Sequence, residues 1–159
     1  MGVLTRSMVL GLAAGGRSSV SFAVPVLAAV RGHEGGGSRL AWALARSAVL
    51  GEVVVDKLPS TPSRLDEPML AARVGAGALG ALALSVVERR RPCAHVVAAL
   101  VGAAGSLLGS IVGAAWRSWA AEAGPEVLRP DLRAALLEDA VVLTAACALV
   151  ATSRWATSG

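Results

Sequence analysis

Residues 93–116 read CAHVVAALVGAAGSLLGSIVGAAW, an apolar run that contains no Asp, Glu, Lys or Arg. A helix needs about 20 consecutive apolar residues to cross the hydrocarbon core of a bilayer. Four further apolar stretches accompany this one, at residues 3–30, 40–58, 69–87 and 132–155. We therefore predict an all-α fold, a polytopic transmembrane helical bundle of about five spans, which forms a single domain over residues 1–159.

The composition supports a membrane bundle over a soluble domain. Of the 159 residues, 55% are hydrophobic and 16% are charged, and the mean hydropathy is +0.63. Soluble domains are about 45–50% apolar and about 25% charged. The chain has 18 Gly, one Phe and no Tyr, a mixture that suits close helix packing in lipid. The basic residues are spread among the apolar stretches without stacking aromatics, which argues against a nucleic-acid partner.

The second stretch, residues 40–58, is the weakest of the predicted spans. It contains Arg46, Glu52 and Asp56. A charge at the centre of a span costs about 2.5–3.5 kcal/mol, while each Leu or Val returns only about 0.3–0.6 kcal/mol. This segment therefore needs partners in the bundle or lies at the interface, and four spans is the alternative count.

The basic residues of the loops predict how the bundle sits in the cell membrane. Arg31 and Arg39 follow the first span, and the run from Arg89 to Arg91 follows the third. Both loops fall on one side if all five stretches cross, and loops rich in Arg face the cytoplasm. We expect a multi-pass protein with its N-terminus outside and its C-terminus cytoplasmic, where Arg154 follows the last span.

Small residues recur every four positions in several spans. Gly105, Gly109 and Gly113 form one such row, and Gly11 and Gly15 belong to another. Such rows let helix backbones approach closely. We expect them to pack helices within the bundle. The alternative is that Gly105, Gly109 and Gly113 form a glycine zipper that lines a homo-oligomeric contact or a narrow pore.

Ionisable residues inside the apolar stretches are the candidate polar site, because such residues are expensive in a bilayer and are usually functional. The candidates are Arg17, Glu52, Asp56, Glu138 and Asp139. On a continuous helix Arg17 lies near mid-bilayer, where it must pair or face water. A structural ion pair with Glu52, Asp56 or Glu138 is one interpretation, and a site for an anion, a proton or a lipid head group is the other.

Glu138 and Asp139 have a second interpretation of their own. They stand where we expect the fifth span to begin in earnest, and a helix N-terminus favours negative charge. Helix capping would then explain both acids without any further function.

The segment from Asp56 to Arg64, DKLPSTPSR, is the most specific local string. Its two prolines forbid a continuous helix, and its hydroxyl groups can satisfy the freed backbone. It is either a rigid turn at the membrane surface or a loop that contacts a head group or another anion through Lys57, Ser63 and Arg64.

These strings together resemble a family of small bacterial integral membrane proteins that is catalogued as a domain of unknown function. The resemblance covers nearly the whole chain. It rests on Gly16-Arg17-Ser18, Glu52, Asp56-Lys57-Leu58-Pro59, Pro62-Ser63-Arg64 and Leu137-Glu138-Asp139-Ala140. It implies a helical bundle of several spans in the bacterial inner membrane and no particular activity. One departure is Gly16, where the family leads us to expect a bulkier residue.

No motif of a hydrolase, a nucleotide-binding protein or a metalloprotease occurs, so we expect neither catalytic activity nor a cofactor. Cys93 and Cys147 lie far apart, and His33 and His95 stand alone near loops, so we expect no metal site. Charged intramembrane positions together with glycine rows favour a small transport or permeation protein. The alternative is a structural or accessory membrane protein that binds a partner complex or lipid head groups.

Overall fold

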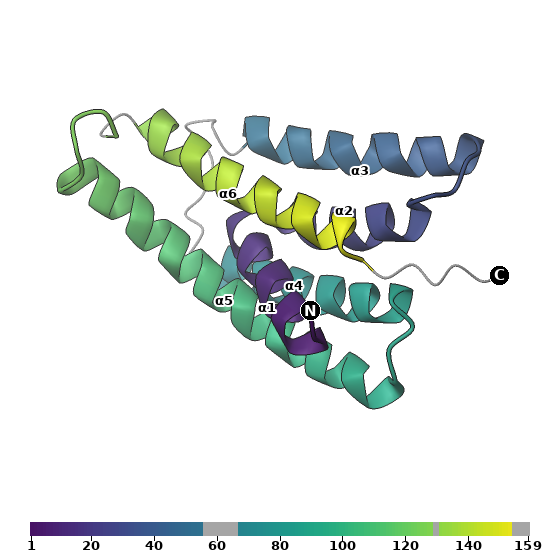
Figure 1. Ribbon diagram of the computed structural model, residues 1–159. Coiled ribbons are helices and arrows are strands. Elements are labelled where there is room, and N and C mark those ends of the chain that lie inside the picture. The colour runs from purple at the N-terminus through teal and green to yellow at the C-terminus, as the bar shows by residue number, and fades with distance from the viewer. Residues whose placement is uncertain (56–66, 129–130, 154–159) are drawn as a thin grey trace.

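The computed structural model describes residues 1–55, 67–128 and 131–153, which form helices and short connections without any strand (Figure 1). The prediction of an all-α helical bundle is therefore confirmed. The helices of these residues are α1 (Val3–Gly16), α2 (Ser18–Val30), α3 (Gly36–Val55), α4 (Glu67–Val87), α5 (Pro92–Glu122) and α6 (Asp131–Ala151).

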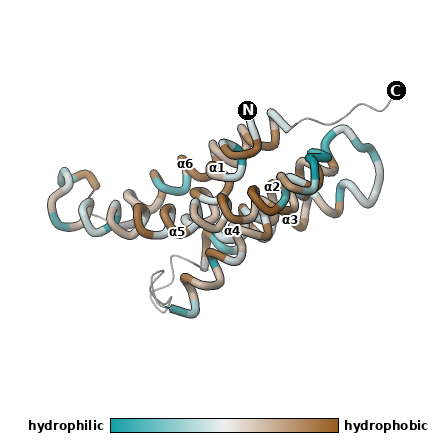
Figure 2. Tube along the Cα trace, turned by 90° about the horizontal axis from the view of Figure 1, so that it is seen from below, coloured by the Kyte–Doolittle hydropathy of each residue, from teal (hydrophilic) through white to brown (hydrophobic). Residues whose placement is uncertain are grey.

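Three of these helices are long and apolar enough to cross a membrane: α4, α5 and residues 132–151 of α6. They coincide with the third, fourth and fifth predicted spans, although α5 continues to Glu122. Large apolar side chains face outward from them, with Leu100 67% and Val141 70% exposed. Figure 2 shows hydrophobic colour along the helices and hydrophilic colour gathered at the turns at both ends of the bundle. This distribution fits a membrane protein.

The first predicted span, residues 3–30, is not one helix. The chain leaves helical geometry at Arg17, whose φ is −144° and ψ is 110°, and α1 and α2 lie on either side of this break. They have 14 and 13 residues, so each is only about 20 Å long at 1.5 Å per residue. Arg17 is therefore not on a helix at all, contrary to the prediction. Gly15 and Gly16, which are weak helix formers, immediately precede the break.

The pair α1–α2 forms a hairpin that turns inside the bundle. Near the start of α1, Arg6 donates from Nη2 to the Leu149 carbonyl at 2.7 Å. Just after α2, Arg31 donates from Nη1 to the Val150 carbonyl at 2.8 Å. Both open ends of the hairpin thus lie at the C-terminal end of α6, and the break points into the interior.

This hairpin brings the two described ends of the chain together. Arg6 donates from Nη1 to the Thr152 hydroxyl at 2.8 Å. The predicted arrangement, with the N-terminus outside and the C-terminus inside, requires the first segment to cross once. In the structure α1 and α2 instead run from one end of the bundle to the break at Arg17 and back to the same end. Arg154, which that prediction also used, lies outside the described residues.

Glycines hold α1 against α5. A Cβ placed on Gly11 would lie 2.4 Å from the Gly102 carbonyl oxygen, and one on Gly109 would lie against the Leu12 backbone. A Cβ on Gly105 would lie 2.8 Å from the Met8 carbonyl oxygen. Gly105 and Gly109 therefore pack helices within the chain, as expected. The homo-oligomeric contact through Gly105, Gly109 and Gly113 stays a prediction.

Helix α3 lies at the outer edge of the bundle and packs chiefly on α2 (Figure 1). Ala45 is its one buried residue among those with described side chains. The Arg46 guanidinium stacks over the Trp42 ring, 3.2 Å from the ring centroid, which shields part of the charge in the apolar environment. The segment that we predicted to insert poorly into a bilayer is thus a helix at the periphery of the bundle.

Candidate functional site

The break between α1 and α2 exposes backbone groups in the middle of the bundle, and side chains from other helices bind them. The last carbonyls of a helix lack partners within it. Arg73 of α4 donates from Nη1 to the Gly15 and Gly16 carbonyls, both at 3.1 Å, and the Ser110 hydroxyl donates to the Gly15 carbonyl at 3.3 Å. A cation at a helix C-terminus also complements the helix dipole.

The start of α2 is bound in the opposite sense by Glu52 of α3. Its Oε1 accepts from the Ser18 N–H at 2.9 Å, and its Oε2 accepts from the Ser19 N–H at 2.8 Å and from the Ser19 hydroxyl. An anion at a helix N-terminus is stabilised by the dipole. Arg73 Nη2 lies 4.0 Å from Glu52 Oε1, so the two capping charges also attract each other.

Arg17, at the break itself, pairs with Asp139 of α6. Arg17 is 1% exposed, and its Nε donates to Asp139 Oδ1 at 2.6 Å, with Nη2 bonding the same oxygen. The predicted need for a partner is met by Asp139, which was not among the partners considered for Arg17. The reason is the break, which turns Arg17 away from the Glu52 cap and toward α6.

The helix-capping interpretation of Glu138 and Asp139 is wrong. Helix α6 begins at Asp131, so both acids lie about two turns inside it. At that depth they face α1 rather than the helix start, and Asp139 is buried.

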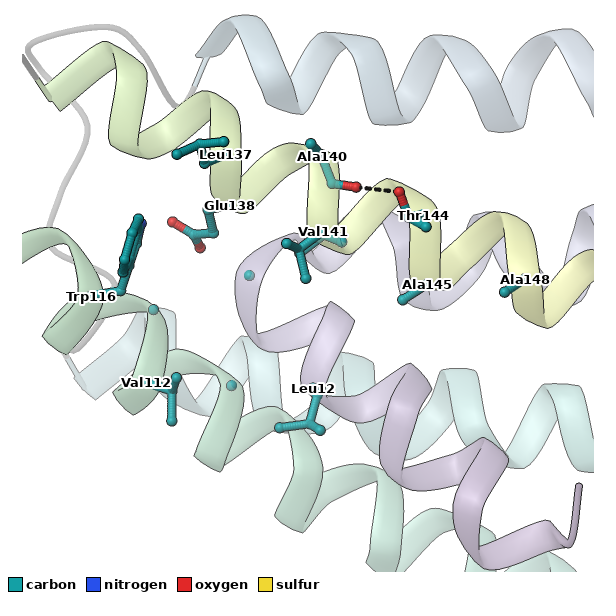
Figure 3. Close-up of a pocket in the computed structure, with 14 residues that line it drawn as sticks. Leu12, Val112, Trp116, Leu137, Glu138, Ala140, Val141, Thr144, Ala145 and Ala148 are labelled. Carbon is teal, nitrogen blue, oxygen red and sulfur yellow. Dashed lines mark hydrogen bonds between the residues drawn. The ribbon is translucent and has the colours of Figure 1, made fainter. Parts of the chain in front are cut away.

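A groove of about 900 Å³ lies between α1, α5 and α6 and reaches this charged break (Figure 3). Its lining includes Gly16 at the end of α1 and Glu138, whose Oε1 would lie 3.4 Å from a Cβ on Gly16. Glu138 is the only charged residue in the described lining, which is otherwise apolar apart from Trp116 and Thr144. Figure 3 shows the Glu138 carboxylate and the Trp116 ring facing the space between α5 and α6.

The polar groups of Trp116 and Thr144 bind backbone carbonyls. Trp116 donates from Nε1 to the Ala134 carbonyl at 3.1 Å, and the Thr144 hydroxyl donates to the Ala140 carbonyl at 2.7 Å. Glu138 is therefore the group that sets the electrostatic character of the groove.

Four of the predicted site residues thus gather around residues 15–19: Arg17, Glu52, Glu138 and Asp139. The fifth, Asp56, lies outside the described residues, as do Lys57, Ser63 and Arg64 of the candidate head-group loop.

Arg73 completes the cluster and was not among the predicted site residues. It is buried and lies inside the predicted third span, so the rule that singled out Arg17 would have found it. The Ser106 hydroxyl donates to the Arg73 carbonyl at 2.8 Å and ties α4 to α5 there.

A second buried ion pair, Arg6 with Glu88, was also missed. Its Nε–Oε1 distance is 2.5 Å, and the two side chains are 4% and 2% exposed. It joins the start of α1 to the end of α4, far from the break.

No cluster of three or more His, Cys, Asp or Glu that could hold a metal ion occurs in the part of the chain that the structure describes. Comparisons of the chain with protein-family models, with curated proteins and with solved structures find no match. The resemblance to the bacterial membrane family therefore stays a prediction.

Proposed function

We propose that this protein is a small membrane transport protein whose intramembrane site is the broken α1–α2 hairpin together with the groove beside it. The observation that carries the proposal is the break at Arg17, bound by charged groups from three other helices. Non-helical backbone at membrane depth is tolerated where protein buries it or where it lines a cavity. Transporters commonly place such broken helices at their substrate site.

We further propose that α3, α4, α5 and α6 cross the membrane and that α1–α2 enters and returns on the cytoplasmic side. The supporting observation is charge. The end of the bundle that holds Arg6 also holds Arg31, Arg39 and the run from Arg89 to Arg91. Loops rich in Arg face the cytoplasm, so both termini are cytoplasmic in this arrangement.

The groove favours a small cation with an apolar body as the substrate class. A carboxylate in an otherwise apolar lining attracts a positive group and offers the rest of the ligand an apolar wall. The described lining contains this carboxylate and no Lys or Arg side chain, which favours a cation over an anion.

The test is uptake of ethidium, an organic cation, into proteoliposomes that contain the purified protein and trapped DNA. We expect protein-dependent uptake, and we expect Glu138→Gln to reduce its rate about tenfold, since each 1.4 kcal/mol of lost attraction is a factor of ten. Glu126→Gln removes an exposed acid outside the groove and should leave uptake unchanged. Absence of protein-dependent uptake, or equal rates in both variants, would contradict the proposal.

One observation favours the second candidate, a structural or accessory membrane protein that contacts a partner complex or lipid. Arg17, Arg73, Glu52 and Asp139 all bind protein groups at the break. This would make the charged cluster a device that holds a bent segment. It predicts no flux and loss of stability alone when the cluster is altered.

A further inference from the structure

A second pocket lies at the opposite end of α2 from the charged break. It has a volume of about 470 Å³ and sits in the corner between α2, α3 and the last turn of α6. The residues that line it are Leu27, Val30, Arg31, Gly32, His33, Ser38, Arg39, Trp42 and Val150. About 20 Å of helix separates Arg31 from Arg17, so this pocket is independent of the proposed transport site.

The polar lining of this pocket is suited to a phosphate group. Arg31 and Arg39 supply two guanidinium groups, which match phosphate oxygens through paired N–H donors. His33 and the Ser38 hydroxyl add further polar atoms. No carboxylate is in the described lining, although Glu34 stands in the same turn, exposed.

One of the two guanidinium groups is fixed in place. Arg31 donates from Nη1 to the Val150 and Ala151 carbonyls. A guanidinium has five N–H donors, and these two bonds use only those of Nη1. The contact to α6 therefore holds the charge at the wall of the pocket and orders it before a ligand binds, which lowers the entropic cost of binding.

The other wall of the pocket is apolar and carries an interfacial aromatic. Leu27, Val30 and Val150 form this wall, and Trp42 is 44% exposed beside them. Trp is enriched at the level of lipid head groups. A free phosphate would use only the basic wall, whereas a lipid would use both. Basic pockets between helices at a cytoplasmic surface bind anionic lipid head groups.

We propose that this corner pocket binds the phosphate of an anionic phospholipid, with the start of the acyl chain against Leu27, Val30 and Val150. The lipid joins α2, α3 and α6, and it anchors the peripheral helix α3 to the bundle. The described lining of this site includes none of the predicted head-group residues Lys57, Ser63 and Arg64, and its existence does not depend on transport.

The test is a titration of the delipidated full-length protein in neutral detergent, read by native mass spectrometry and by thermal stability. The probes are short-chain phosphatidylglycerol, short-chain phosphatidylcholine and inorganic phosphate. We expect phosphatidylglycerol to bind about tenfold more tightly than phosphatidylcholine, since basic residues near a membrane surface attract anionic lipid. Equal affinity for the two lipids would overturn the proposal.

Two double variants distinguish a built pocket from general positive charge. Arg31→Gln/Arg39→Gln should weaken phosphatidylglycerol binding about tenfold or more, again from the contribution of each basic residue. Arg89→Gln/Arg91→Gln removes the same charge from exposed positions at the same end and should leave binding within about twofold. Equal losses of lipid binding in both variants would overturn the proposed site, because the lipid would then respond to positive charge in general.

A single variant and a competition with inorganic phosphate complete the test. If Arg31→Gln lowers expression through its contact with α6, Arg39→Gln alone should still weaken lipid binding several-fold, and unchanged binding would count against the site. Inorganic phosphate that displaces the lipid at equal concentration would show a free-phosphate site and overturn the assignment to a lipid.

Discussion

At the scale of single residues, the buried charges hold the bent segment in place. Arg17 and Asp139 form an ion pair whose side chains are 1% and 8% exposed. Removing one partner of a buried pair leaves an uncompensated charge, which is costly in a protein interior. The pair therefore fixes α6 against the break, and its loss should be felt as loss of stability.

We expect Arg17→Gln and Asp139→Asn each to lower the free energy of unfolding by about 3–5 kcal/mol. Unfolding in mixed micelles titrated with SDS measures this change. The double variant Arg17→Gln/Asp139→Asn should lose at most half of the summed change in unfolding free energy, because no buried charge is then left without its partner.

The control for this pair is Arg91→Gln, an exposed arginine, which should change stability by less than about 0.5 kcal/mol. Purely additive losses in the double variant would show that the two side chains do not act together and would contradict the pairing.

The sequence predicted that Arg17 needs a partner but not which one. Hydropathy and spacing treat residues 3–30 as one helix, and the possible partners predicted for Arg17 were Glu52, Asp56 and Glu138. The choice of Asp139 depends on where the helix breaks and on the register of α6 against α1. Neither is encoded in local periodicity. The same reasoning applies to Arg73, because it is a charged residue inside an apolar stretch.

At the scale of elements, close contact between α1 and α5 depends on residues without side chains. A Cβ on Gly15 would lie 2.5 Å from the Ser106 carbonyl oxygen and 2.5 Å from the Ser110 nitrogen. Both contacts are with backbone, which cannot rotate away. The recurrence of glycine every four residues predicted such packing, and the structure assigns it to contacts within one chain.

We therefore expect Gly15→Ala to destabilise the protein by about 1–3 kcal/mol, the usual cost of overpacking. Gly75→Ala is the matched control, because nothing lies within 4 Å of its Cβ position on α4. Gly75→Ala should be neutral or slightly stabilising, since Ala favours helix over Gly. The SDS midpoints of the two variants give the comparison, and equal midpoints would argue against close α1–α5 packing.

The later predicted spans overlap single helices, and the first does not. Residues 69–87, 93–116 and 132–155 correspond to α4, α5 and α6 because each is a long apolar run between polar turns. Residues 3–30 are also an apolar run, and the Gly15-Gly16-Arg17 interruption within it was too short to predict a division. The division requires Arg73 and Glu52 to bind the freed backbone, and these residues come from distant parts of the sequence.

At the scale of the whole molecule, the proposed placement of the chain in the membrane depends on the α1–α2 hairpin. Because α1 and α2 both open toward the C-terminal end of α6, the start and the end of the described chain share one end of the bundle. That end also carries the basic turns that precede α3 and α5. In the proposed arrangement, a continuous first span would reverse the side on which the N-terminus lies.

The most direct test is cysteine accessibility on the two sides of sealed membranes, in a background with Cys93→Ser and Cys147→Ser. Single cysteines replace Gly2, Glu34 and Glu126, which are all exposed, and a membrane-impermeant maleimide labels them. A re-entrant α1–α2 hairpin predicts that positions 2 and 34 label from the same side and that position 126 labels from the other. Labelling of positions 2 and 34 from opposite sides would show that the first segment crosses and would contradict the account.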